Sequence, residues 1–167
     1  MNESVENGDA WSFRPAVAAD EAFLYQLFHS ARAHELWMFP EEQRETLIRM
    51  QFAGQQYTYT TNYGDGGHRI ILIDGRPAGR LWLFEDDASL LVVDIILLSE
   101  YRNRGIGGRI YADLMAKAKQ ASKKVRCTVS SANPGSRRFH DRLGFRETSS
   151  DGFYTDMDWT APEPTNP

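Results

Sequence analysis

The chain has 167 residues, of which 41% are hydrophobic, 25% charged and 12% aromatic, and one is a cysteine. This length suits a single domain, and the aromatic content excludes an intrinsically disordered chain. A single cysteine excludes a disulfide framework or a zinc ribbon within one chain. No window is apolar enough for a membrane span and residues 1–11 lack a secretory signal, so we expect a cytoplasmic protein with no membrane partner.

The formal net charge of −4 is unevenly distributed along the chain. Residues 102–146 carry twelve Lys and Arg but only two Asp, so this segment nets +10 and the remainder nets −14. Such asymmetry favours an anionic ligand at the basic segment and a cationic one elsewhere. The alternative for several of the lysines is a solvated helix face. Nucleic acid is not expected as a partner, because the acidic remainder would repel its phosphates.

The first part of the chain predicts a strand followed by two helices. Residues 11–14 alternate as a short strand. Asp20 is expected to cap a helix, because apolar side chains recur after it at helical spacing as far as residue 31. Pro40, followed by two glutamates, opens a second helix that we expect to fray over residues 55–63.

The middle of the chain changes to the periodicity of strands. After a glycine-rich turn, residues 69–74 and 77–84 flank the sequence Asp-Gly-Arg-Pro, which predicts a hairpin. Residues 90–98 form a nearly continuous apolar run. Such a run is typical of a central strand that is covered on both faces.

The last part of the chain predicts a helix beginning at Gly105, a strand over residues 125–129, a helix over 134–143 and a final strand over 153–159. Apolar residues at four-residue spacing support the first of these helices. The element order is β-α-α-β-β-β-α-β-α-β-β, which predicts a mixed α/β fold.

These elements predict one domain over residues 11–160. The polar ends, residues 1–10 and 161–167, are expected to be flexible. We find no linker, repeat or low-complexity tract between them.

The junction between the central strand and the following helix has the chemistry of an anion site. The first backbone N–H groups of a helix have no internal partner, and the helix dipole adds positive potential there. Glycines allow a phosphate to reach the main chain, and arginines supply complementary charge. The pattern G-x-x-x-x-G-K-[ST] of a nucleoside-triphosphate loop is not matched. The loop consists of Arg102, Asn103, Arg104, Gly105, Ile106, Gly107 and Gly108.

At this loop the sequence resembles the GNAT superfamily of N-acetyltransferases. The family's pyrophosphate loop, R/Q-x-x-G-x-G/A, is matched by Arg102, Gly105 and Gly107. A second hallmark is an Asn before a short helix that ends in F-Y-x-x-x-G-F, and it is matched by NPGSRRFHDRLGF. In that segment the matching residues are Asn133, Ser136, Phe139, Gly144 and Phe145. The resemblance extends from about Trp11 to Trp159.

The resemblance implies a single-domain α/β (α+β) GNAT fold, with a mixed, mostly antiparallel sheet whose fourth and fifth strands splay apart. It also implies acetyl transfer from acetyl-CoA to an acceptor that is usually an amine, without a metal. The pantetheine arm would pair with the backbone of the fourth strand, and a strand amide would polarise the thioester carbonyl. The cofactor-binding residues implied are the loop of residues 102–108 together with Ile96, Leu97, Leu98, Asn133, Ser136 and Phe139.

Asp94 interrupts the apolar run LLVVDIILL, where an ionised carboxylate is costly unless it is paired. In several relatives of this family an acidic residue at this position acts, often through water, as the general base for the acceptor amine. Burial would raise its pKa, which suits that role. The alternative is a structural ion pair with Arg80 on the neighbouring strand.

His140 stands where many family members have a tyrosine that protonates the departing thiolate. Histidine can donate a proton near pH 7, so it is a candidate for the same role. Alternatively, the side chain only packs against the acetyl-CoA arm, because thiolates leave readily without an acid.

The remaining cysteine and histidines are given structural roles. Cys127 lies on an alternating strand and is expected to be a small buried apolar side chain rather than a nucleophile. His29, His34 and His68 lack the spacing of metal ligands, and no metal is expected.

The acceptor is expected to bind at the two N-terminal helices and the stretch that follows them. The acidic remainder of the chain favours a cationic acceptor, such as a polyamine, an amino sugar or a lysine side chain of a protein. The alternative for these helices is an exposed end or a dimer contact, and we expect a monomer or a homodimer. The unusual residues there are Glu35, Trp37, Glu41, Gln51, Gln55, Gln56, Tyr57 and Tyr59.

The sequence therefore predicts an acetyl-CoA-dependent N-acetyltransferase that acts by direct attack of an amine in a ternary complex. The first alternative is an acyl-CoA-binding module that has lost turnover, for which His140 is the indication. The second is a regulator that binds ATP or another ligand at the same loop. The absence of a P-loop lysine speaks against that second alternative.

Overall fold

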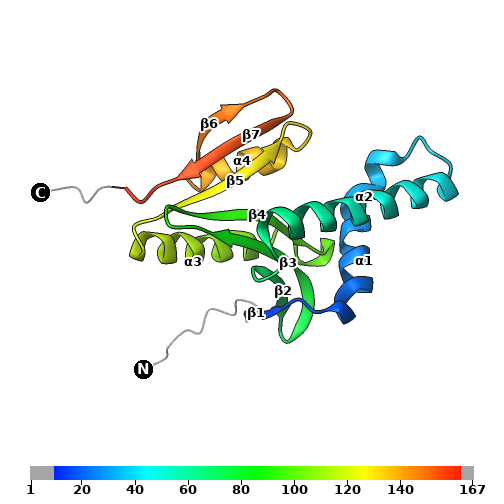
Figure 1. The fold of residues 1–167 in the computed structure, drawn as a ribbon, viewed down its shortest axis with the longest axis horizontal. Coiled ribbons are helices and arrows are strands. Elements are labelled where there is room, and N and C mark those ends of the chain that lie inside the picture. The colour runs from blue at the N-terminus through cyan, green and yellow to red at the C-terminus, as the bar shows by residue number, and fades with distance from the viewer. Residues whose placement is uncertain (1–9, 163–167) are drawn as a thin grey trace, which may run out of the picture. The chain divides into compact units, whose positions relative to one another are not determined.

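The computed structural model describes residues 10–162. Residues 1–9 and 163–167, which make up most of the two expected flexible ends, lie outside the described residues. The main elements are β1 (Trp11–Pro15), α1 (Glu21–Arg32), α2 (Glu41–Tyr63), β2 (His68–Ile73), β3 (Arg76–Glu85), β4 (Ser89–Leu97), α3 (Ile106–Gln120), β5 (Lys124–Ser130), α4 (Pro134–Arg142), β6 (Arg146–Ser150) and β7 (Tyr154–Trp159) (Figure 1). This order confirms the predicted succession of helices and strands.

The strands follow the order β1-β2-β3-β4-β5-β7-β6 in a seven-stranded sheet. β1 pairs antiparallel with β2, and β7 pairs antiparallel with both β5 and β6. β4 and β5 are parallel. The sheet is therefore mixed and mostly antiparallel, as the resemblance implied. No helix within residues 10–162 combines the length and the apolar character needed to cross a membrane.

The chain divides into two compact units. In the described residues, unit 1 comprises residues 10–81 and 95–106, and unit 2 comprises residues 82–94 and 107–162. β3 and β4 each contribute to both units. The expected domain limits at residues 11 and 160 stay a prediction.

In unit 1 the apolar faces of α1 and α2 form a shared core. Leu24 and Phe28 of α1 pack with Ile48 and Phe52 of α2 and with Ile70 of β2. The rings of Phe28 and Phe52 lie 5.6 Å apart. Apolar residues at helical spacing in both segments explain why they fold as amphipathic helices against each other.

α2 continues to Tyr63, so the expected fraying over residues 55–63 is wrong. Arg80, on β3, is 2% exposed and donates to the side-chain oxygens of Gln55 (2.7 Å) and Gln56 (2.8 Å). These contacts stabilise a polar segment that has little apolar periodicity of its own. The helix ends where Gly64 adopts a left-handed φ of 68°.

Asp20 does not cap α1 through its side chain, which corrects the expectation from the sequence. Its carboxylate accepts two hydrogen bonds from the Arg14 guanidinium, at 2.6 and 2.7 Å, and one from the Val17 backbone N–H at 2.9 Å. The bond from Arg14 is the main cause of the lowered pKa of Asp20. The carboxylate therefore ties β1 to the turn before α1.

Unit 2 is built around β5, β7 and β6, which lie side by side, with α4 packed against β5 (Figure 1). Val125, Cys127 and Val129 alternate inward along β5, as predicted. Burial raises the pKa of the Cys127 thiol to about 12. This is the behaviour of an inert apolar side chain rather than of a nucleophile.

Candidate active site

The loop between β4 and α3 contains two residues in the left-handed backbone conformation. A short 3-10 helix, Ser99–Tyr101, follows β4, and α3 begins at Ile106. Asn103 and Gly105 adopt left-handed φ values of 58° and 75°. A side chain at Gly105 would be strained, because L-residues rarely adopt this conformation. The loop from Arg102 to Gly105 is exposed.

Gly107 and Gly108, in the first turn of α3, have no structural reason to lack a side chain. A Cβ at Gly107 would lie 3.6 Å from the ring of Phe139, an ordinary contact, and a Cβ at Gly108 would meet nothing within 4 Å. Neither residue has a positive φ. Their small size keeps the N-terminal backbone of the helix open to a ligand, and that backbone carries N–H groups without intrahelical partners.

The guanidinium of Arg102 also fixes the end of β4. Its Nε donates to the carbonyl oxygen of Leu97 at 2.7 Å. The backbone N–H of Leu98 donates to the carbonyl oxygen of Ala78, on β3, at 2.9 Å. Residues 96–98 are the segment expected to pair with the pantetheine arm. In unit 1 this segment is hydrogen-bonded to β3 at Leu98 and to the side chain of Arg102 at Leu97.

Gly79 on β3 is a positioning residue that the sequence analysis missed. A Cβ at this position would lie 2.3 Å from the carbonyl oxygen of Ile96. Only glycine allows the two backbones this close approach. An isolated glycine inside a predicted strand was the available signal.

β4 and β5 pair over a short segment that ends before Asp94. Their parallel register runs from Ser89 with Lys124 to Val92 with Cys127. Asp94 follows on β4, in unit 2, and is half-buried. Its charge contributes to raising the pKa of Tyr111, although burial is the main cause. Both interpretations of Asp94, as a general base and as an ion-pair partner, stay predictions.

His140 is buried and both of its ring nitrogens are hydrogen-bonded. Nε2 lies 2.8 Å from the hydroxyl of Tyr111, and Nδ1 lies 2.8 Å from the carbonyl oxygen of Ser136. Burial lowers the pKa of His140. A neutral, fully engaged imidazole has no acidic proton to give to a leaving group near pH 7. Both interpretations of His140, as a proton donor and as a side chain that packs against the acetyl-CoA arm, stay predictions.

Asn133, Ser136 and Phe139 are brought together around α4. Asn133 caps this helix, with its side-chain oxygen accepting from the Ser136 backbone N–H at 3.0 Å. Phe139 is half-buried, and its ring lies 5.5 Å from that of Tyr111 at 68°. Tyr111 is thus central to this group in unit 2. Tyr111 was not predicted as a site residue, because in the sequence it occupies an ordinary apolar position of an amphipathic helix.

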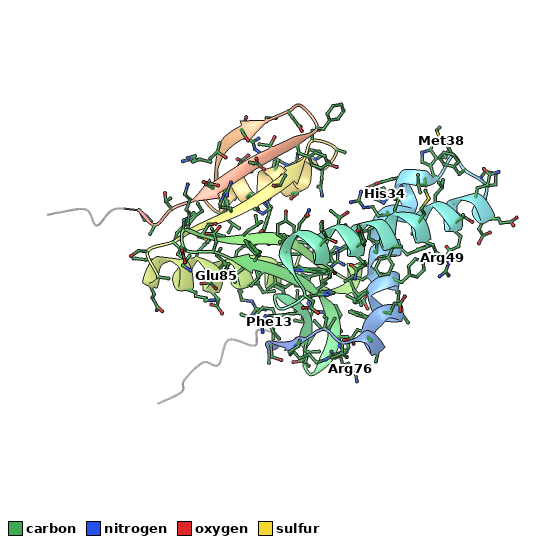
Figure 2. The ribbon with its side chains drawn as sticks, in the orientation of Figure 1. Phe13, His34, Met38, Arg49, Arg76 and Glu85 are labelled. Atoms are coloured by element: carbon green, nitrogen blue, oxygen red, sulfur yellow. The ribbon has the colours of Figure 1, made fainter. Side chains whose placement is uncertain are left out.

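The expected acceptor residues, all in unit 1, are placed differently from one another. Gln55 and Gln56 bind Arg80, and Glu35 accepts from Arg32 at 3.2 Å. Trp37 lies beside Met38 in the turn before α2, and their side chains are 73% and 74% exposed (Figure 2 labels Met38). Among residues 10–162, no three His, Cys, Asp or Glu side chains gather as metal ligands.

An open pocket of about 360 Å³ lies in unit 1 between the start of α1, the middle of α2 and the start of β2. Its lining includes the apolar side chains of Leu24 and Phe52 and the polar side chains of Glu21, Gln56 and His68. Gln56 is the expected acceptor residue that lines it. The implied cofactor-binding residues lie elsewhere in the chain.

A family model described as Acetyltransferase (GNAT) family matches residues 23–145. The matched span includes the glycine-containing loop, Asp94 and the whole of α4. No curated protein matches the chain significantly in sequence.

Solved structures share the fold at low sequence identity. The PaiA N-acetyltransferase from Thermoplasma acidophilum, in complex with coenzyme A, is 18% identical with a TM-score of 0.68, over 91% of this chain and 99% of that one. A GNAT family acetyltransferase from Elizabethkingia anophelis with acetyl-CoA bound is 16% identical with a TM-score of 0.56, over 90% and 98%. Naa50 from Arabidopsis thaliana, in complex with the bisubstrate analogue CoA-Ac-MVNAL, is 11% identical with a TM-score of 0.59, over 90% and 99%. These likenesses confirm the predicted fold.

Proposed function

Because the chain belongs to the GNAT family of acetyltransferases, we propose that it transfers the acetyl group of acetyl-CoA to a primary amine, with both substrates bound at once. The observation that carries the proposal is the start of α3. There Gly107 and Gly108 leave the main chain open although neither strain nor packing requires glycine. A diphosphate bound at a helix N-terminus needs such an opening. Relatives of the same fold hold coenzyme A or acetyl-CoA.

Each implied binding residue receives a role in this proposal. The amides of residues 102–108 bind the pyrophosphate, and the charges of Arg102 and Arg104 complement it. The backbone of residues 96–98 pairs with the pantetheine arm. Asn133 donates to the same arm through Nδ2, since its side-chain oxygen accepts from the helix that it caps. Ser136 and Phe139 complete the binding set beside it.

The chemistry is an acyl transfer from sulfur to nitrogen. The amine nitrogen forms a bond to the thioester carbonyl carbon, and the carbon–sulfur bond breaks with its electron pair going to sulfur. Asp94 accepts the proton that the attacking nitrogen loses, through a water molecule. A backbone amide of β4 stabilises the negative charge on the carbonyl oxygen. We assign His140 no proton-transfer role, because burial lowers its pKa and both of its ring nitrogens are hydrogen-bonded.

The acceptor is proposed to be an amine that is cationic in water. Outside residues 102–146 the chain nets −14, and this charge attracts cations over a long range. The acidic residues first attract the protonated amine. Because the amine must lose its proton before it can attack, the base then removes that proton.

A second candidate function is an acyl-CoA-binding module without turnover. The observation that favours it is again His140, which replaces the usual tyrosine and is not placed to donate a proton. The two functions predict the same binding of acetyl-CoA. They differ in whether CoA thiol is released.

The test is a thermal-shift titration with acetyl-CoA, CoA and ATP, followed by a thiol-release assay over a panel of amines. We expect saturable stabilisation by both CoA forms, about 2.7 kcal/mol at a hundredfold excess over the dissociation constant, and none by ATP. Amine-dependent thiol release identifies the enzyme, whereas binding without release identifies the module. If neither CoA form stabilises the protein, both functions are excluded. If ATP competes with CoA, the loop is a general nucleotide site.

A further inference from the structure

The hydroxyl of Tyr111 and the ring of His140 form a buried polar pair between α3 and α4, 2.8 Å apart. Their side chains are only 1% and 5% exposed. The rings meet edge to face at 87°, with centroids 5.1 Å apart. A buried polar group is destabilising unless its hydrogen bonds are complete, so every partner of this pair matters.

The second ring nitrogen of His140 fixes the direction of these bonds. Nδ1 lies 2.8 Å from the carbonyl oxygen of Ser136, which can only accept, and 3.4 Å from the Ser136 hydroxyl, so the shorter contact assigns the proton to Nδ1. In a neutral imidazole Nε2 then accepts from the Tyr111 hydroxyl. In this single tautomer, the hydrogen bond from Tyr111 on α3 fixes the orientation of the His140 ring on α4.

The hydrogen bonds continue to the start of α4. The backbone N–H of Ser136 donates to Oδ1 of Asn133 at 3.0 Å, and Asn133 is the N-cap of the helix. A series of three bonds thus links Tyr111 to His140, His140 to Ser136, and Ser136 to Asn133. Because the cap uses Oδ1, the amide of Asn133 presents Nδ2 as its donor to a ligand.

We propose that Tyr111 and His140 are positioning residues that hold the Asn133 amide in the orientation that binds the pantetheine arm. This inference rests on the proposed function, which assigns Asn133 to that arm. Tyr111 touches neither cofactor nor reacting atoms in this scheme. His140 stands where relatives have a tyrosine that acts as an acid. Here its ring links buried Tyr111, by hydrogen bonds, to Ser136 and so to the N-cap residue Asn133.

Three variants break the series at defined points. Tyr111→Phe removes only the hydroxyl. His140→Asn keeps a donor at the Nδ1 position but has no atom at Nε2, whereas His140→Gln keeps a group near Nε2 and loses Nδ1. The matched control is Leu114→Ala, one turn along α3, which removes buried apolar contacts without altering any of the three bonds.

The measurement is the dissociation constant of CoA by isothermal titration calorimetry, with steady-state kinetics on any amine that is accepted. We expect each of the three variants to bind CoA about threefold to tenfold more weakly, in the range of one lost hydrogen bond. KM for acetyl-CoA should rise while kcat changes little. Leu114→Ala should lower the melting temperature and leave CoA affinity within about twofold of wild type. The double variant Tyr111→Phe/His140→Asn should match His140→Asn alone, since both changes remove the same bond.

The inference is overturned if Tyr111→Phe and His140→Asn bind CoA like the wild type, if their effects multiply, or if Leu114→Ala weakens CoA binding as much. Wild-type protein that fails to bind CoA would overturn the proposed function and this inference with it. Wild-type binding with unaffected variants would overturn the inference alone. The two failures are therefore distinguishable in one set of titrations.

Discussion

A methyl group added to Gly79 would stand 2.3 Å from the carbonyl oxygen of Ile96, well inside van der Waals contact. β3 therefore passes β4 at a distance that only glycine permits, where β4 enters the segment assigned to the pantetheine arm. The first prediction follows from this contact.

Gly79→Ala should lower the free energy of unfolding by about 1–3 kcal/mol, because the backbone of one strand must shift to relieve the overlap. CoA affinity should fall as well, since Ile96 and Leu97 would move. Urea unfolding and CoA titration measure the two effects. Gly66→Ala, where a Cβ would meet nothing within 4 Å, is the control and should change neither. Unaltered stability in Gly79→Ala would show that the strands are not in this contact.

Gly107→Ala separates ligand binding from folding. The new Cβ would make an ordinary 3.6 Å contact with Phe139, so helix propensity should maintain or raise stability by up to about 1 kcal/mol. CoA affinity should nevertheless drop about tenfold or more, because the methyl group obstructs the approach of a phosphate to the helix N-terminus. Gly54→Ala, in α2, makes the same change in another helix and should leave CoA affinity unchanged. A CoA titration in which both variants behave alike would exclude a phosphate at Gly107.

Asp94→Asn tests the proposed base. The amide cannot accept a proton, so kcat should fall roughly tenfold to a thousandfold while the dissociation constant of acetyl-CoA stays the same. The measurement combines saturating kinetics with calorimetric titration. Asp113→Asn removes an equal charge from the exposed face of α3 and should have no effect on either quantity. Full turnover in Asp94→Asn would leave the carboxylate with a structural role only.

Asp20 should make the protein sensitive to acid. Arg14 holds the pKa of Asp20 below its ordinary value, so the stabilisation is present above the unfolded pKa of about 3.9 and is lost as pH falls through the lower folded value. The free energy of unfolding of the wild type should therefore decline below about pH 4. Asp20→Asn should remove about 1–3 kcal/mol at pH 7 and flatten this part of the decline.

Urea unfolding at pH 7 and in steps down to pH 3 checks the acid sensitivity, and Arg14→Met supplies the other half of a double-variant cycle. The two substitutions should be strongly non-additive, because each removes the same ion pair. Additive losses would mean that Asp20 contributes to the free energy of unfolding through its hydrogen bond from the Val17 N–H rather than through Arg14.

Secondary structure was predicted correctly where the periodicity of apolar residues along the sequence is clear. The alternation of Val125, Cys127 and Val129 predicted a strand, and in the structure these three side chains lie on one buried face of β5. The expected element order included a strand before the last one, but no residues were assigned to it. That strand is β6, Arg146–Ser150, whose residues are all polar and exposed and therefore show no alternation of apolar and polar side chains. Its strand conformation comes from pairing with β7.

Contacts between residues far apart in the chain were not accessible in the same way. The second half of α2 is stabilised by Arg80, which lies more than twenty residues further along, so propensity alone suggested fraying. Tyr111 and His140 are separated by 29 residues. Nothing in the spacing of either helix indicates that a hydroxyl from one meets a ring from the other.

The lone cysteine has a practical consequence for enzymology. Released CoA is conveniently followed with reagents that react with thiolates, and a protein thiol usually contributes background. Here Cys127 is 4% exposed and its pKa is about 12, so the folded protein offers such reagents almost no thiolate at pH 8. The wild-type protein should therefore add little background signal to a thiol-release assay. For the same reason, a single reporter cysteine introduced on its surface could be labelled selectively.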